Sequence, residues 1–130
     1  MMPKAKLVAL YNTTTIGAHA ENEALRYLER NGLKLIARNY KIKGGEIDLI
    51  MQDQEFTVFI EVKFRQSEIY GDAPTLVTPQ KRQRLIRAAK TFLLEKNEYD
   101  TAHGRFDIIA IFADHSSEIT WIKNAFEVNY

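Results

Sequence analysis

The fold prediction rests first on residues 45–65, GEIDLIMQDQEFTVFIEVKFR. Two runs rich in apolar residues, EIDLIM and FTVFIEVKF, flank the polar tripeptide DQE, which predicts two strands joined by a tight turn. Buried strands rarely carry ionisable side chains, yet these strands contain Asp48, Glu61 and Lys63. These three residues are therefore the first candidates for a functional site.

The predicted hairpin brings the two acidic residues together. If its turn is centred between Gln54 and Glu55, Asp48 lies opposite Glu61, and alternation along the strand puts Lys63 on the same face. Opposed residues have Cβ atoms about 5 Å apart, and two carboxylates that close repel each other unless one is protonated or a cation lies between them. Hard oxygen ligands without a neighbouring His or Cys favour Mg²⁺ or Mn²⁺ over zinc, so we expect Asp48 and Glu61 to bind such a metal.

A second interpretation needs no metal. A buried cluster of Asp, Glu and Lys is also typical of a structural ion-pair network. The facing carboxylates, the lysine two residues beyond Glu61, and Gly44-Gly45, which we expect to leave room where the strand begins, together favour the metal site.

The rest of the chain predicts one α/β domain. Apolar residues at helical spacing predict helices over about 16–31 and from about Thr78 to Glu95, and β-rich runs occupy residues 33–42, 105–114 and 118–128. The expected order is α-β-β-β-α-β-β, with a mixed central sheet of about five strands flanked by helices. Residues 1–16 show no period and are expected to form an irregular arm, followed by a single domain over 17–130.

The composition of the chain bears on the number of domains, the kind of partner and the cellular location. A chain of 130 residues with 45% apolar content suits one domain. The net charge of +1 means that attraction to a polyanion must come from a local patch. The chain contains no cysteine and no apolar run long enough for a signal peptide or a membrane span, so we expect a cytoplasmic protein that does not enter a membrane.

The second predicted helix supplies such a local patch. Residues 81–90 contain five cations and no acid, and helical geometry places Lys81, Arg84 and Arg87 along one side. This face suits a phosphate backbone, although a solvated helix surface is the ordinary alternative. We expect two further residues to extend the patch: Arg65, next to the strand that carries Glu61 and Lys63, and Gln80 at the helix start.

Several motifs, taken in their order along the chain, resemble those of a known family. GEIDLI (45–50) followed by FIEVKFR (59–65) resembles the Asp…Glu-x-Lys core of the restriction-endonuclease-like, or PD-(D/E)XK, nucleases. The resemblance is closer to the YraN-type family of bacterial proteins and covers about residues 17–128, including GAHAENEALRYLERNG (17–32), VTPQKRQRLIRAAKTFL (77–93) and RFDIIAI (105–111). It implies an endonuclease-like core in which Asp48 and Glu61 are metal ligands, Lys63 is the catalytic lysine and Glu21 completes the catalytic set.

The expected function is therefore Mg²⁺-dependent hydrolysis of phosphodiester bonds in DNA, including branched or structured DNA, to which the resemblance extends through archaeal junction resolvases. The alternative is a non-catalytic nucleic-acid-binding or adaptor protein of DNA uptake or repair that retains the same core. A homodimer would suit symmetric cutting of two strands.

Overall fold

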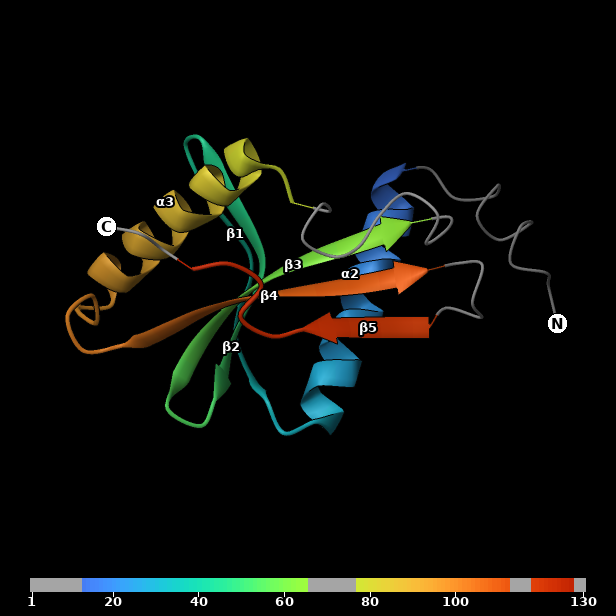
Figure 1. The fold of residues 1–130 in the computed structure, drawn as a ribbon, viewed down its shortest axis with the longest axis horizontal. Coiled ribbons are helices and arrows are strands. Elements are labelled where there is room, and N and C mark those ends of the chain that lie inside the picture. The colour runs from blue at the N-terminus through green and yellow to red at the C-terminus, as the bar shows by residue number, and fades with distance from the viewer. Residues whose placement is uncertain (1–12, 66–76, 113–117, 128–130) are drawn as a thin grey trace, which may run out of the picture.

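The computed structural model describes residues 13–65, 77–112 and 118–127, and the side chains from residue 17 onward. Two helices and five strands follow one another along the chain (Figure 1). They are α2 (Thr13–Arg30), β1 (Lys34–Ile42), β2 (Gly45–Asp53), β3 (Phe56–Arg65), α3 (Pro79–Glu95), β4 (His103–Phe112) and β5 (Glu118–Ile122). The order α-β-β-β-α-β-β confirms the prediction.

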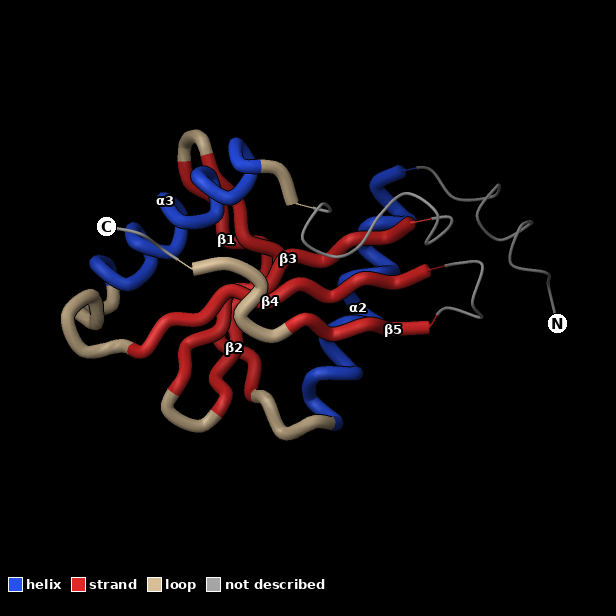
Figure 2. The backbone as a smooth tube through the Cα atoms, in the orientation of Figure 1, coloured by secondary structure: helices blue, strands red, loops and turns tan. Residues whose placement is uncertain are grey.

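The five strands form one mixed sheet in the order β1-β2-β3-β4-β5. Only β3 and β4 pair in parallel, and the other neighbours are antiparallel. A parallel pair needs a crossover connection, and α3 lies in the segment that joins β3 to β4. The predicted mixed α/β sheet flanked by helices is therefore confirmed, with α2 and α3 on opposite faces (Figure 2).

The register of the β2–β3 hairpin is the one that the sequence predicts. Leu49 pairs with Ile60 and Asp53 pairs with Phe56, as expected for a turn centred between Gln54 and Glu55. The regular pairing ends at Leu49 and Ile60. Asp48 and Glu61 therefore occupy the next positions in the same register, where the two strands stop exchanging ladder bonds.

Each face of the sheet carries its own apolar core. On one face, Phe59 and Ile108 pack in a cluster with Leu85 and Phe92 of α3. On the other, the apolar residues of β2, β3 and β4 pack with three residues of α2, namely Ala20, Ala24 and Leu28. Because both faces of the central strands are packed, Glu61 and Asp107 in these strands are almost fully buried.

The position of α3 is fixed near both of its ends. Thr78 caps the helix by accepting a hydrogen bond from the Lys81 N–H, and Pro79 follows in the first turn, in agreement with the predicted start. Towards the other end, the Tyr40 hydroxyl of β1 donates a 2.9 Å hydrogen bond to Glu95. The helix is thereby held against the β1–β2 hairpin.

Two predicted boundaries are wrong. Helix α2 includes residues 13–16, which the sequence analysis assigned to an irregular arm, because the β-branched run Thr13–Ile16 has weak helix propensity and conceals the helical start. Residues 1–12 of that arm lie outside the described residues. Strand β5 ends at Ile122 rather than near residue 128, because Asn124 takes a left-handed conformation (φ 52°) and its N–H binds Asp107.

No helix in the described part of the chain combines the length and apolar character needed to cross a membrane.

Candidate active site

The end of the β2–β3 pairing places Asp48 against the backbone of β3. The Val62 N–H donates a 2.9 Å hydrogen bond to Asp48 Oδ2. A carboxylate thus accepts a backbone N–H immediately beyond the last ladder pair. This bond fixes the Asp48 carboxyl beside the strand that carries Glu61 and Lys63.

Glu61 is the second acidic residue, and it is 5% exposed. Its Oε1 lies 3.4 Å from Lys63 Nζ and 3.7 Å from Lys81 Nζ. Its Oε2 is buried and has no hydrogen-bond partner. A buried carboxylate oxygen without a donor is costly, so Oε2 of Glu61 is available as a metal ligand.

Burial and neighbouring charges both act on the acidic residues of the cluster. Burial raises the pKa of Glu61 to about 7, and the nearby Asp48 charge adds to this effect, while Lys81 and Lys63 oppose it. Burial also raises the pKa of Asp48, against the hydrogen bond from Val62. The Asp48 charge raises the pKa of Glu61 in addition to burial, and carboxyl groups held this close together are the arrangement expected of a metal site.

Helix α2 contributes a third carboxyl group. Glu21 Oε1 is buried and, like Glu61 Oε2, has no hydrogen-bond partner. Burial raises the pKa of Glu21 most, and the Asp48 charge is the next cause. The structure therefore brings Glu21 near Asp48. Glu46, which the sequence analysis overlooked although it directly follows Gly44-Gly45, also raises the pKa of both residues.

The donor set fits a hard divalent cation. The two unpartnered oxygens belong to carboxylates, the ligand type that Mg²⁺ and Mn²⁺ prefer. Within residues 13–65, 77–112 and 118–127, no three acidic, His or Cys side chains converge closely enough to hold an ion by themselves. A metal here would therefore take two carboxylates, Asp48 and Glu61, and complete its coordination with water, as Mg²⁺ commonly does.

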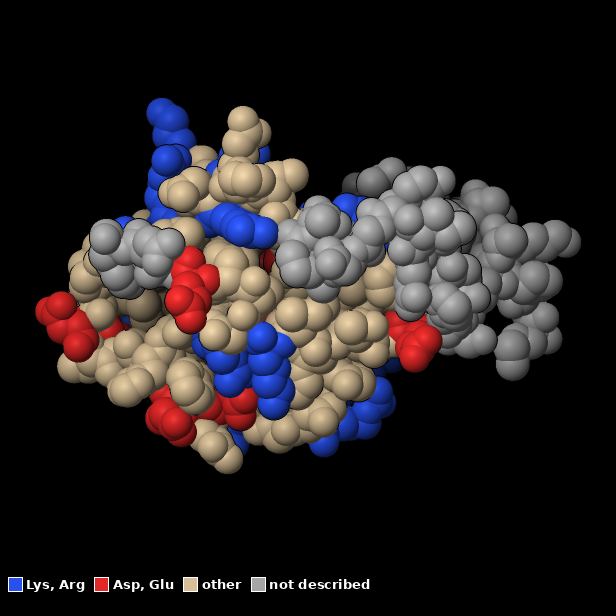
Figure 3. Space-filling model, viewed as in Figure 1, with Lys and Arg blue, Asp and Glu red and all other residues tan. Residues whose placement is uncertain are grey.

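The basic residues of α3 do not all lie on one exposed face, contrary to the sequence prediction. Arg84, Arg87 and Gln80 are exposed, and Figure 3 shows Lys and Arg side chains gathered over α3 and the β1–β2 turn. Lys81 instead faces the acidic cluster. Arg65 is half-buried at the end of β3, where it makes a long hydrogen bond of 3.4 Å to the Phe64 carbonyl.

A groove adjoins this basic surface, and one of its lining residues, Lys81, also lies beside Glu61. It has a volume of about 380 Å³ and lies between the β1–β2 turn and the start of α3, lined by Lys41, Ile42, Gly44, Gly45, Glu46, Lys81 and Arg84. The glycines do not act as spacers, as the sequence analysis expected. A Cβ atom on Gly45 would lie 2.6 Å from the Arg84 carbonyl oxygen, so Gly45 permits the turn to touch α3 directly. Gly45 and Arg84 both line the groove, so this contact is part of its lining.

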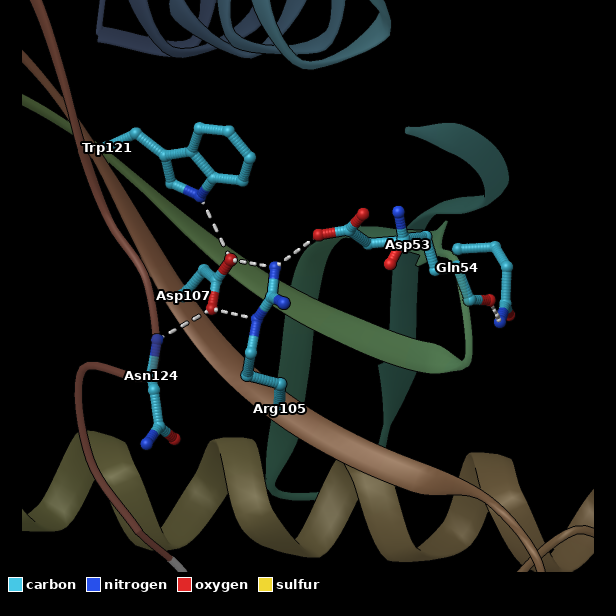
Figure 4. Close-up of polar contacts among 7 residues, drawn as sticks. Asp53, Gln54, Arg105, Asp107, Trp121 and Asn124 are labelled. Carbon is cyan, nitrogen blue, oxygen red and sulfur yellow. Dashed lines mark hydrogen bonds and ion pairs between the residues drawn. The ribbon is translucent and has the colours of Figure 1, made fainter. Parts of the chain in front are cut away.

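Asp107 is a buried acidic residue to which the sequence analysis gave no role. It is 1% exposed and accepts hydrogen bonds from Arg105, the Trp121 indole N–H and the Asn124 N–H (Figure 4). Arg105 also binds Asp53 at 2.9 Å. Because both oxygens of Asp107 are satisfied, this network fixes β4, β5 and the β2–β3 hairpin and differs from the unsatisfied cluster around Glu61. An Arg-x-Asp pattern entering an apolar strand was the available signal.

Comparison with known proteins gives a consistent match. Residues 20–111, which include every candidate site residue, match the model of a family described as "Uncharacterised protein family UPF0102". A UPF0102 protein of Klebsiella pneumoniae is 51% identical over 107 residues, covering 82% of this chain and 81% of that protein. A UPF0102 protein of Coxiella burnetii is 48% identical over 118 residues (91% and 97%), and one of Saccharophagus degradans is 45% identical over 122 residues (94% and 99%).

Proposed function

The chain belongs to the uncharacterised protein family UPF0102, and we propose that it is a metal-dependent nuclease that hydrolyses phosphodiester bonds in DNA. The observation that carries this proposal is the pair of buried, unpartnered carboxylate oxygens, Oε2 of Glu61 and Oε1 of Glu21, on two residues whose pKa the Asp48 charge raises. A structural ion-pair network would be expected to satisfy such oxygens. We include in the proposal a restriction-endonuclease-like arrangement of the sheet.

In this proposal Asp48 and Glu61 hold Mg²⁺ or Mn²⁺, and Glu21 orients water at the same centre. The bound ion would supply charge neutralisation at the phosphate and a more acidic water molecule. Asp48 is prepared for this role because the Val62 N–H fixes one of its oxygens at 2.9 Å. Glu61 is prepared because its Oε2 is already desolvated and has no other donor.

Lys63 is the proposed catalytic cation. Its ammonium lies 3.4 Å from Glu61 Oε1 and its side chain is 22% exposed, so it reaches the metal centre from the strand while remaining accessible to substrate. A cation at this position stabilises an attacking hydroxide and the negative charge that develops on the phosphate oxygens. Lys63 keeps its position because it projects from the same strand as Glu61.

The exposed arginines of α3 are the proposed contacts with DNA. Among the described residues, neither Arg84 nor Arg87 has an ion pair with an acidic side chain. Both are therefore available to phosphate oxygens, which bind arginine strongly. Arg84 lines the groove, and Arg87 lies next to Gly44 in its lining. This position would direct the nucleic acid towards Glu61.

A nuclease assay tests the proposal. Purified protein is incubated with duplex, single-stranded and branched DNA in Mg²⁺, beside a Lys63→Ala variant prepared identically. We expect Lys63→Ala to bind metal normally and to cut about 100-fold or more slowly, the usual scale for such an electrostatic group. Equal cleavage by both proteins would indicate a contaminating nuclease and contradict the assignment.

The same assay separates the alternative, a non-catalytic nucleic-acid-binding or adaptor protein. Such a protein would bind DNA without cutting any of the three substrates in Mg²⁺ or Mn²⁺. Absence of both metal binding and DNA binding would instead indicate that the cluster around Glu61 is a structural ion-pair network.

A further inference from the structure

Glu61 has two ammonium partners on one oxygen and none on the other. Lys63 comes from β3 and Lys81 comes from the first turn of α3, so separate elements supply the two cations. Their charges also act on Asp48. In the absence of a metal, Lys63 and Lys81 therefore partly balance the charges of Asp48 and Glu61.

A divalent cation would upset this balance. If an ion with two positive charges binds at Asp48 and Glu61, both ammonium groups are repelled at short range. Lys81 is the one able to leave. It lies farther from Glu61 Oε1 than Lys63 does, 3.7 Å against 3.4 Å, and its side chain is more exposed, 32% against 22%.

The groove gives Lys81 a destination. Lys81 lines it together with Lys41 and Arg84, and Gly45, which touches α3 closely, is also part of the lining. A phosphate held there would meet lysine and arginine side chains from two different elements. Glu46, which also lines the groove, would disfavour an anion, so the site needs the additional cation.

We propose that this groove is a phosphate-binding subsite next to the metal centre, and that the Lys81 ammonium turns from Glu61 towards the groove, which Lys81 already lines, when a metal binds at Glu61. The inference rests on the proposed function, since it needs a metal at Asp48 and Glu61. The ligand class is a nucleic-acid phosphate next to the one at the metal centre. Metal binding therefore prepares the protein for DNA, and Lys81 acts as a positioning residue.

Chemical labelling tests the displacement directly. The metal-free protein and the calcium-loaded protein are reductively methylated under identical conditions, and each lysine is quantified by mass spectrometry. Calcium is used because it is a hard divalent ion that binds carboxylate oxygens. We expect calcium to increase the labelling rate of Lys81 several-fold and to leave that of Lys34, exposed at the far end of β1, unchanged. Equal labelling of Lys81 in both states would overturn the displacement.

Salt-dependent DNA binding tests the subsite. Affinity for a fixed duplex is measured with and without calcium for wild type, Lys81→Met and the matched control Lys34→Met. Each phosphate contact contributes about 0.9 to the slope of log affinity against log salt. We expect Lys81→Met to lose about one unit of slope in calcium and none without metal, whereas Lys34→Met loses neither and Lys81→Arg keeps the wild-type slope.

The remaining outcomes of these measurements distinguish failure of this inference from failure of the nuclease proposal. An equal loss with and without calcium would show that Lys81 binds DNA independently of metal, and no loss in either state would exclude it from the interface. Both results overturn the inference while leaving the nuclease proposal intact. If calcium produces no binding heat with the wild-type protein, the metal site itself is wrong, and the nuclease proposal and this inference are overturned together.

Discussion

Substitution of Glu61 by glutamine should stabilise the metal-free protein at alkaline pH. Burial and the neighbouring Asp48 charge raise the pKa of Glu61 from 4.5 to about 7. Between these values the folded state binds more protons than the unfolded state, so the free energy of unfolding falls as pH rises. Above about pH 7 the charged Glu61 costs about 3 kcal/mol, the equivalent of its shift at 1.36 kcal/mol per unit.

The glutamine variant removes that cost and part of the ion pairing with Lys63 and Lys81. We therefore expect Glu61→Gln to be more stable than wild type by about 1–3 kcal/mol near pH 8, which corresponds to a rise in Tm of about 3–9 °C for a domain of this size. Near pH 4 the difference should largely disappear, because Glu61 is then protonated in the folded state. Thermal melts in EDTA at both pH values measure these effects.

The control is Glu55→Gln in the β2–β3 turn, where the side chain is exposed. It removes the same charge and should change Tm little at either pH. A decrease in Tm for Glu61→Gln near pH 8 would refute the reasoning, because it would mean that Lys63 and Lys81 stabilise the charged carboxylate more than burial opposes it. The cluster would then be a structural salt bridge.

Three further substitutions test the positioning of the site. Gly45→Ala should destabilise the protein by about 1–3 kcal/mol, because its Cβ would meet the Arg84 carbonyl oxygen at 2.6 Å, whereas Gly17→Ala in open space should not; equal melting of both variants would contradict the close contact. Asp107→Asn should lower the unfolding free energy by about 3–5 kcal/mol without changing metal affinity, and altered metal affinity in a calorimetric titration would contradict a purely structural role. The Arg84→Ala/Arg87→Ala double variant should flatten the salt slope of DNA binding by about 1.8 units, and an unaltered slope would make this an ordinary solvated face.

The hairpin is the part of the site that the sequence predicts best. A two-strand register depends on local information, namely the alternation of apolar residues and the position of the turn. It therefore predicts that Asp48 and Glu61 share a register position, and the observed pairing of Leu49 with Ile60 agrees. Pro79 and the apolar stripe of α3 are equally local signals, and the helix they predict is observed.

Contacts between distant elements could not be obtained in this way. Lys81 forms an ion pair with Glu61, whereas Arg84 and Arg87 of the same helix are exposed. Helical spacing alone places all three cations along one side of α3 and does not predict this difference. The difference between Lys81 and the two arginines depends on how α3 crosses the sheet and on the close contact between α3 and Gly45. The hydrogen bonds of Asp107 likewise join β4 to residues that follow it by 14 and 17 positions.

Calorimetric titration of a divalent ion tests the central claim most directly. Mn²⁺ is added to the metal-free wild-type protein, to Asp48→Asn and to Glu55→Gln. We expect saturable binding to wild type and Glu55→Gln, and an affinity at least about tenfold lower for Asp48→Asn, since a ligand is lost from a site with few protein ligands. No binding to wild type, or equal binding to all three proteins, would contradict the assignment of Asp48 and Glu61 as a metal centre.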